Sequence, residues 1–163
     1  MFQGRIIIFV AIGGLIAILI GIIYYASLDN PKLQQAKIRL TEIKVMDINT
    51  VERYVKLQIT FLVHNPTDKT FTVPLIAYKL FADNVLIGNG QYSTEDIAMP
   101  GRAAFYPNTE IPLTHIFRLT FSENIEKKYY DIINNENVRF TAEGTITLEN
   151  AWSIVEKNFE ASL

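Results

Sequence analysis

Histidine, serine and cysteine are the residue types whose spacing would most readily reveal a catalytic or metal site in this chain. His64 and His115 are the only histidines, and they show neither His-Glu-x-x-His nor His-x-His spacing, so we predict no metal site. Ser93, Ser122 and Ser153 lack the flanking glycines of a hydrolase nucleophile elbow. The chain contains no cysteine, which excludes disulfides and thiolate catalysis.

A pair of carboxylates is the remaining arrangement that could support catalysis. The acidic residues considered for it are dispersed through segments of alternating polarity, where charges usually form a solvated face: Glu42, Glu52, Glu95, Asp96 and Glu110. We therefore predict no catalytic residue, no cofactor and no small-molecule substrate, and an enzyme with a carboxylate site stays a remote alternative. A net charge of -2 gives no reason to expect nucleic acid as a partner.

The first residues of the chain form an apolar run that matches a membrane helix. No charged residue occurs from Ile6 to Ala26, and about 20 apolar residues span a bilayer core of about 30 Å. Tyr24 and Tyr25 lie at the far end, where aromatic rings favour the headgroup region. A cleaved signal peptide is the alternative, but the run is too long and these tyrosines make a poor cleavage site. We predict a retained transmembrane anchor over residues 1–26.

The charges that flank this run bear on its orientation. Arg5 and the amino group precede it, whereas Asp29, Lys32 and Lys37 follow it. A short tail followed by a long folded region favours a cytoplasmic N-terminus. We therefore expect a single-pass protein of the cell membrane with an extracytoplasmic C-terminal domain.

Small residues mark one face of the predicted anchor. Gly13, Ala17 and Gly21 are spaced four apart, and such spacing lets a second helix approach closely. Glycine is common in membrane helices, so the pattern also fits a helix without a partner. If the stripe is used, we expect other membrane proteins as partners.

The remaining chain is predicted to be a short linker, residues 27–35, followed by one domain, residues 36–163. Its most regular stretch begins at Tyr54 and ends at Asn65-Pro66, because proline lacks the N–H that a central strand needs. Every second residue of this stretch is apolar, as in a strand with one buried face: Val55, Leu57, Ile59, Phe61 and Val63.

Further strand signals surround this central stretch. The apolar parity of residues 36–48 changes near Thr41-Glu42, which indicates a bulge or two short strands. Residues 75–82 are apolar on both faces, so we expect them to be covered on both sides. Asp83-Asn84 fits a hairpin turn. Residues 138–148 alternate again and are predicted to be a closing strand.

One helix is expected within these strands. Ser122 is a candidate N-cap, followed by an acidic first turn. The apolar residues that come next have helical spacing: Ile125, Tyr129, Ile132 and Ile133. We expect this helix to pack over one open end of a mainly β domain.

The order of these elements resembles the LEA type 2 group, also called LEA14-like or the WHy (water stress and hypersensitive response) domain. The resemblance covers about Ala36 to Leu148 and depends on His64-Asn65-Pro66-Thr67, a strand with Pro74, the segments 78–84 and 86–90, and a Pro100-Gly101 turn. It implies an immunoglobulin or fibronectin III-like β-sandwich with one packed helix and no catalytic residues, in which Asn65, Pro66, Pro100 and Gly101 are structural. Cytosolic members lack a membrane helix, which argues against a freely diffusing desiccation protectant here.

The tail, residues 149–163, allows two interpretations. Ala151, Trp152, Val155 and Phe159 have helical spacing, whereas Ile154 falls off that stripe, so a short helix and a final strand both remain open. Trp152 and Phe159 are candidates for docking on a partner, and packing on the chain's own domain is the alternative.

Together these features predict a membrane-anchored, extracytoplasmic binding or structural module that contacts the lipid bilayer and other membrane proteins. Its expected role is stress protection or protein scaffolding. The alternative is an accessory single-span subunit of an integral membrane enzyme complex. High Ile, Asn and Lys usage suggests an AT-rich prokaryotic or archaeal source, so an archaeal respiratory or ammonia-oxidising complex is a candidate for such an assembly.

Overall fold

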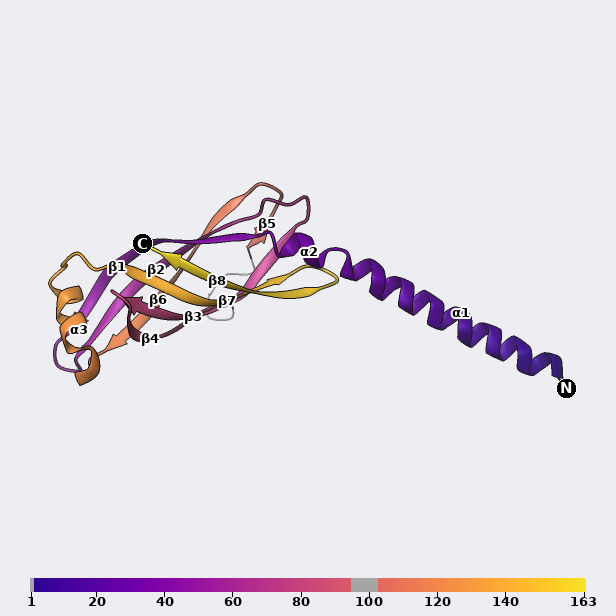
Figure 1. Ribbon diagram of the computed structural model, residues 1–163, viewed down its shortest axis with the longest axis horizontal. Coiled ribbons are helices and arrows are strands. Elements are labelled where there is room, and N and C mark those ends of the chain that lie inside the picture. The colour runs from indigo at the N-terminus through magenta and orange to yellow at the C-terminus, as the bar shows by residue number, and fades with distance from the viewer. Residues whose placement is uncertain (1, 95–102) are drawn as a thin grey trace.

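The computed structural model describes residues 2–94 and 103–163 and has two parts, a long helix and a β-sandwich (Figure 1). Helix α1 (Phe2–Ser27) projects from one end of the sandwich, and helix α3 (Glu126–Ile133) covers the opposite end. The predicted fold class, a mainly β sandwich with one packed helix preceded by an apolar helix, is confirmed. The predicted Pro100-Gly101 turn lies outside the described residues.

Helix α1 is 26 residues long, and its described apolar side chains are exposed. Its last turn ends where the Ser27 hydroxyl donates a hydrogen bond to the Tyr24 carbonyl oxygen at 2.7 Å. By length and composition the helix is a candidate membrane span, and none of its apolar window is buried against the domain. Within the part of the chain that the structure describes, the sandwich does not cover this helix.

Two antiparallel sheets form the sandwich. The first has the order β1-β2-β6, and the second has the order β4-β3-β7-β8, with the short β5 also paired to β3. The strands of the first sheet are β1 (Lys37–Asn49), β2 (Tyr54–His64) and β6 (Glu110–Thr120). The strands of the second are β3 (Phe71–Ala82), β4 (Val85–Ser93), β5 (Ala104–Phe105), β7 (Phe140–Glu149) and β8 (Ile154–Ser162).

Strand β2 lies at the centre of its sheet and supplies one wall of the core. The five alternate residues that were predicted to face inward are all fully buried: Val55, Leu57, Ile59, Phe61 and Val63. The neighbouring strand β1 is continuous, but its pairing with β2 shifts between Leu40 and Glu42 and again between Val45 and Asp47. The first shift is the predicted bulge, and it moves the inward-facing parity by one residue.

Strand β3 differs from the expectation that residues 75–82 are covered on both faces. Its inner face is buried, but Ala77 and Lys79 on the other face are exposed, so the middle of the strand is covered on one side only. The predicted Asp83-Asn84 hairpin turn is present, and both residues have positive φ, 46° and 67°.

Glycine is required where β7 pairs with the middle of β3. Gly144 pairs with Tyr78, and a Cβ at this position would overlap the Ala77 carbonyl oxygen and the Tyr78 Cα. The two backbones can approach this closely only without a side chain at residue 144.

The helical segment begins with a 3-10 turn, Glu123–Ile125, which continues into α3. Ile125, Tyr129 and Ile132 are buried, as their spacing predicted. Ser122 precedes the turn with an extended backbone, but its side chain makes no capping hydrogen bond, so the predicted side-chain cap is wrong. The Phe121 ring before this segment packs edge-on against the Tyr129 ring, with 5.3 Å between the ring centroids.

Candidate functional site at the helix–domain junction

Glu42, Glu52 and Glu110, the described acidic residues considered for catalysis, do not pair with one another. Each of those described is bonded to a basic side chain at the surface instead: Glu42 to Lys44 at 3.2 Å, Glu52 to Arg118 at 3.1 Å and Glu110 to Arg39 at 2.8 Å. Glu95 and Asp96 lie outside the described residues. Among the residues that are described, no group of three His, Cys, Asp or Glu side chains is placed to hold a metal ion.

One histidine is part of the interior of the sandwich. The His115 Nε2 and the Tyr78 hydroxyl lie 2.6 Å apart between the sheets, and His115 stacks on the Phe61 ring. Burial lowers the pKa of His115 to about 4 and raises the pKa of Tyr78. The imidazole is therefore neutral at pH 7 and serves as a polar contact between the sheets. His64 ends β2 and pairs with Lys37 and Glu110, so the two histidines do not share a site.

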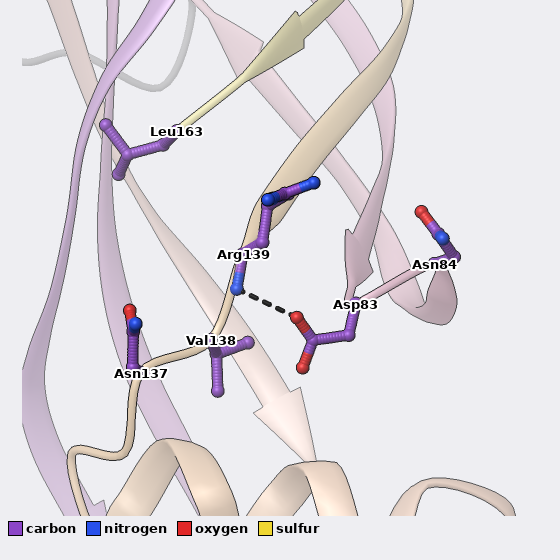
Figure 2. Close-up of a pocket in the computed structure, with 6 residues that line it drawn as sticks. All are labelled: Asp83, Asn84, Asn137, Val138, Arg139 and Leu163. Atoms are coloured by element: carbon purple, nitrogen blue, oxygen red, sulfur yellow. Dashed lines mark hydrogen bonds between the residues drawn. The ribbon is translucent and has the colours of Figure 1, made fainter.

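A shallow cavity of about 430 Å³ lies at the α3 end of the sandwich (Figure 2). The Asp83 carboxylate beside it accepts hydrogen bonds from the Arg139 backbone N–H at 3.0 Å and from the Lys128 ammonium at 2.7 Å. The Lys128 hydrogen bond, followed by that from Arg139, lowers the pKa of Asp83. The carboxylate holds the β3–β4 turn to the start of β7, which is a structural role and not that of a general base.

The Asn65-Pro66 motif lies at the end of the sandwich opposite α3, where the Asn65 side chain hydrogen-bonds to neighbouring residues. The Asn65 side-chain N–H groups donate to the carbonyl oxygens of Lys69 at 2.7 Å and Phe105 at 2.8 Å. Its side-chain oxygen accepts from the Thr67 N–H at 3.0 Å and the Thr67 hydroxyl at 2.8 Å. Asn65 is fully buried. These hydrogen bonds fix the loop after β2.

The segment after α1 is attached closely to the domain. Residues 27–35 include the short helix α2 (Asn30–Leu33), and the Leu33 side chain is fully buried in the core. Ala36 is buried as well, and its carbonyl oxygen accepts a hydrogen bond from the Lys157 ammonium on β8 at 2.6 Å. The segment is therefore held by packing at the last residue of α2 and just after it.

Ion pairs reinforce the junction between α1 and the domain. The Lys32 ammonium lies 2.8 Å from the Asp68 carboxylate, and the Lys69 ammonium lies 3.1 Å from Asp29. The hydrogen bond from Lys32 lowers the pKa of Asp68, and the hydrogen bond to Asp29 raises the pKa of Lys69. Both pairs join α2 and the residue before it to the loop that Asn65 holds, and they add to the packing of Leu33 and Ala36.

The β7–β8 turn is the third part of this junction. The Asn150 side-chain oxygen accepts from the backbone N–H groups of Trp152 at 2.9 Å and Ser153 at 2.8 Å. The Asn150 amide also donates to the Asp29 carboxylate at 3.4 Å. Sequence patterns missed this contact because it joins residues 121 positions apart. An Asn between two candidate strands was the available signal for the turn.

The two aromatic residues of the tail, Phe159 and Trp152, lie in different surroundings. Phe159 lies on β8 and packs edge-on against the Phe61 ring at 5.7 Å, inside its own domain. Trp152 lies at the hairpin tip and is 69% exposed. It lines a groove of about 580 Å³ with residues of α1: Ile18, Gly21, Ile22 and Tyr25.

The stripe of small residues on α1 faces open space. A Cβ added at Gly13 or at Gly21 would meet no atom within 4 Å, and Ala17 is exposed. Gly21, at the end of the stripe nearest the domain, also lines the groove beside Trp152.

Comparison with known proteins shows that this chain shares its fold with solved structures. No family model matches the chain, and no curated protein matches it. A solved structure of an Arabidopsis thaliana protein matches with a TM-score of 0.52 at 12% identity, over 77% of this chain and 79% of that chain. This likeness shows a shared sandwich fold and does not extend to activity.

Two further structures match with lower TM-scores. A protein of Archaeoglobus fulgidus has a TM-score of 0.45 at 15% identity, over 76% of this chain and 94% of that chain. A protein provisionally assigned to the late embryogenesis abundant (LEA) group has a TM-score of 0.45 at 11% identity, over 94% of this chain and 87% of that chain.

Proposed function

We propose that the chain is a membrane-anchored module of the LEA14/WHy type that works by binding, with its sandwich domain outside the cytoplasm. The observation that carries the proposal is α1, an unburied apolar helix long enough to cross a bilayer and joined to the domain by packed contacts and ion pairs. A bilayer would cover apolar side chains that are otherwise left in water.

The chemistry of the described residues supports binding over catalysis. Glu42, Glu52 and Glu110 each form an ion pair, and Asp83 holds a turn. The LEA14/WHy assignment is supported by the order of sequence motifs and by the shared sandwich fold. In this proposal the domain protects the envelope under stress or holds other proteins at the membrane, and it is not an enzyme.

Purification of the tagged full chain from detergent-solubilised membranes tests the binding role. A module that holds other proteins is expected to co-purify with specific partners at a fixed ratio, seen by mass spectrometry and native gel mobility. A chain that runs as a lone monomer from several gentle detergents would remove the scaffolding role and leave only a protective one.

The second candidate function is an accessory single-span subunit of an integral membrane enzyme complex. The observation that favours it is the open face formed by Gly13, Ala17 and Gly21, where another helix could approach the α1 backbone. An archaeal respiratory or ammonia-oxidising complex is a candidate for the host assembly, on the grounds of residue usage alone.

Filling the small-residue face tests this candidate. Gly13→Leu combined with Gly21→Leu is expected to release the chain from its complex, because the added side chains block close helix approach. Leu15→Phe with Leu19→Phe adds bulk on the opposite face and serves as the control, which should still co-purify. Equal co-purification of both double variants would remove the stripe as a helix contact.

A further inference from the structure

The β7–β8 hairpin tip, residues 150–154, is an exposed apolar feature of the domain that lies beside α1. Trp152 is 69% exposed and Ile154 is 67% exposed. None of the five residues of the tip is charged. A tryptophan combines a large apolar ring system with one N–H donor, and it favours the boundary between lipid headgroups and acyl chains.

The groove next to Trp152 belongs to the apolar part of α1. Its other lining residues have the i, i+3, i+4, i+7 spacing of one helix face: Ile18, Gly21, Ile22 and Tyr25. At a rise of about 1.5 Å per residue, Ile18 lies about 10 Å along the helix axis from Tyr25, towards the N-terminus. If α1 crosses the bilayer, Trp152 is beside residues of the span and not above them.

The tip is held in this position by hydrogen bonds. Asn150 accepts from the N–H groups of Trp152 and Ser153, which fixes the turn, and it donates to Asp29 at the end of α1. Asp29 is itself paired with Lys69 at 3.1 Å. Trp152 is therefore presented to the groove by a bonded turn, and little conformational freedom is lost when it meets lipid.

We propose that Trp152 inserts into the headgroup boundary of the bilayer and that lipid acyl chains fill the groove between Trp152 and α1. This second membrane contact rests on the proposed membrane anchoring of α1 and adds to it. A single helix can tilt within the bilayer, and the domain attached to it would tilt with it. A second contact on the hairpin tip restrains that tilt, so the domain holds one orientation to the membrane surface.

Intrinsic fluorescence tests the proposal without any substitution, because Trp152 is the only tryptophan of the chain. The full chain is reconstituted in phosphatidylcholine vesicles, and its co-flotation with the vesicles is checked first. The expected results are an emission shift to shorter wavelength, protection from acrylamide, and quenching by lipids brominated near the headgroup that exceeds quenching by lipids brominated near the chain ends. The control variant Trp152→Phe/Tyr130→Trp moves the reporter to the exposed Tyr130 position on α3 and should show none of these effects.

The outcomes separate the two proposals. A chain that fails to float with vesicles would overturn the proposed anchoring, and the tip contact with it. A chain that floats, but whose Trp152 emission is quenched by acrylamide and not by brominated lipid, would overturn the tip contact alone.

A photo-cross-linking residue at position 152 in native membranes distinguishes lipid from a protein occupant. A cross-link to lipid supports the proposal. A cross-link to a discrete protein contradicts it, because a protein would then fill the groove.

Discussion

Asn65 shows how a single residue can fix a loop without having a binding role. Its amide is fully buried and uses both its donors and its acceptor on Lys69, Phe105 and Thr67. Pro66 follows, and its missing N–H prevents β2 from continuing. An aspartate or serine could not donate two hydrogen bonds to carbonyl oxygens at this position, so asparagine is the side chain that the loop needs.

Removal of this amide is expected to destabilise the domain strongly. Asn65→Ala leaves two buried carbonyl oxygens without their donors, and we expect a loss of about 2–4 kcal/mol in the free energy of unfolding. Urea unfolding of the full chain in detergent, followed by circular dichroism, measures it. Asn89→Ala, at an exposed position of β4, is the control and should change stability by less than about 0.5 kcal/mol. Equal midpoints for the two variants would contradict the structural role of Asn65.

We expect the stability of the domain to fall at acidic pH because His115 is buried in its neutral form. Burial lowers its pKa from the ordinary 6.5 to about 4 in the fold, so the unfolded chain binds the proton more readily. The stability is fully present above about pH 6.5 and falls as pH decreases towards 4, by about 2–3 kcal/mol.

Urea midpoints measured between pH 7.5 and pH 4 for the wild-type chain and for His115→Gln test this dependence. The variant retains the contributions of the carboxyl groups but lacks the imidazole. We expect a steeper loss of stability in the wild type. Parallel curves would show that the buried imidazole does not resist protonation.

At the scale of elements, the short helix α2 connects α1 to the core of the sandwich. Its Leu33 side chain is fully buried, whereas Leu28, five residues earlier, is 50% exposed. Leu33→Ala is therefore expected to cost about 2–4 kcal/mol, and Leu28→Ala less than about 0.5 kcal/mol. The urea midpoints of the two variants give the comparison. A small effect at Leu33 would show that α2 is not part of the core.

Most strands could be predicted from the sequence, because one buried face imposes a period of two. Strand β2, the first bulge in β1 and the turn at Asp83-Asn84 follow from local pattern. For the last strand, β8, the sequence pattern fits both a short helix and a strand. Its inward-facing positions alternate from Val155 to Ala161 but include Lys157, whose apolar stem is half-buried while its ammonium reaches Ala36. Because Lys157 interrupts the apolar residues on the inner face, the two-residue period of a strand is not visible in the hydrophobicity of this segment.

At the scale of the whole molecule, the junction site could be predicted only in part. The apolar run, the small-residue stripe and the Asn65-Pro66 motif are local patterns and could be named from sequence. The contact of Asn150 with Asp29 depends on how the last hairpin folds back to the first helix, 121 residues away. Trp152 stood out as the single tryptophan, but its place beside α1 required the three-dimensional arrangement.

The elongated shape of the molecule gives the two ends of the sandwich different surroundings in our proposal. Helix α1 and the β7–β8 tip lie at one end, and α3 lies at the other (Figure 1). A bilayer around α1 places α3 away from the lipid surface. The α3 end is then the part of the domain most accessible to partners outside the membrane.

Topology labelling tests the central claim most directly, because the chain has no cysteine and any introduced cysteine is unique. Lys127→Cys on the exposed side of α3 reports on the domain, and Gln3→Cys reports on the N-terminal end. In intact cells, a membrane-impermeant maleimide is expected to label the membrane-bound Lys127→Cys chain, and to label Gln3→Cys only after permeabilisation. Labelling of Lys127→Cys only after permeabilisation, or recovery of the chain away from the membrane fraction, would contradict an anchored extracytoplasmic domain.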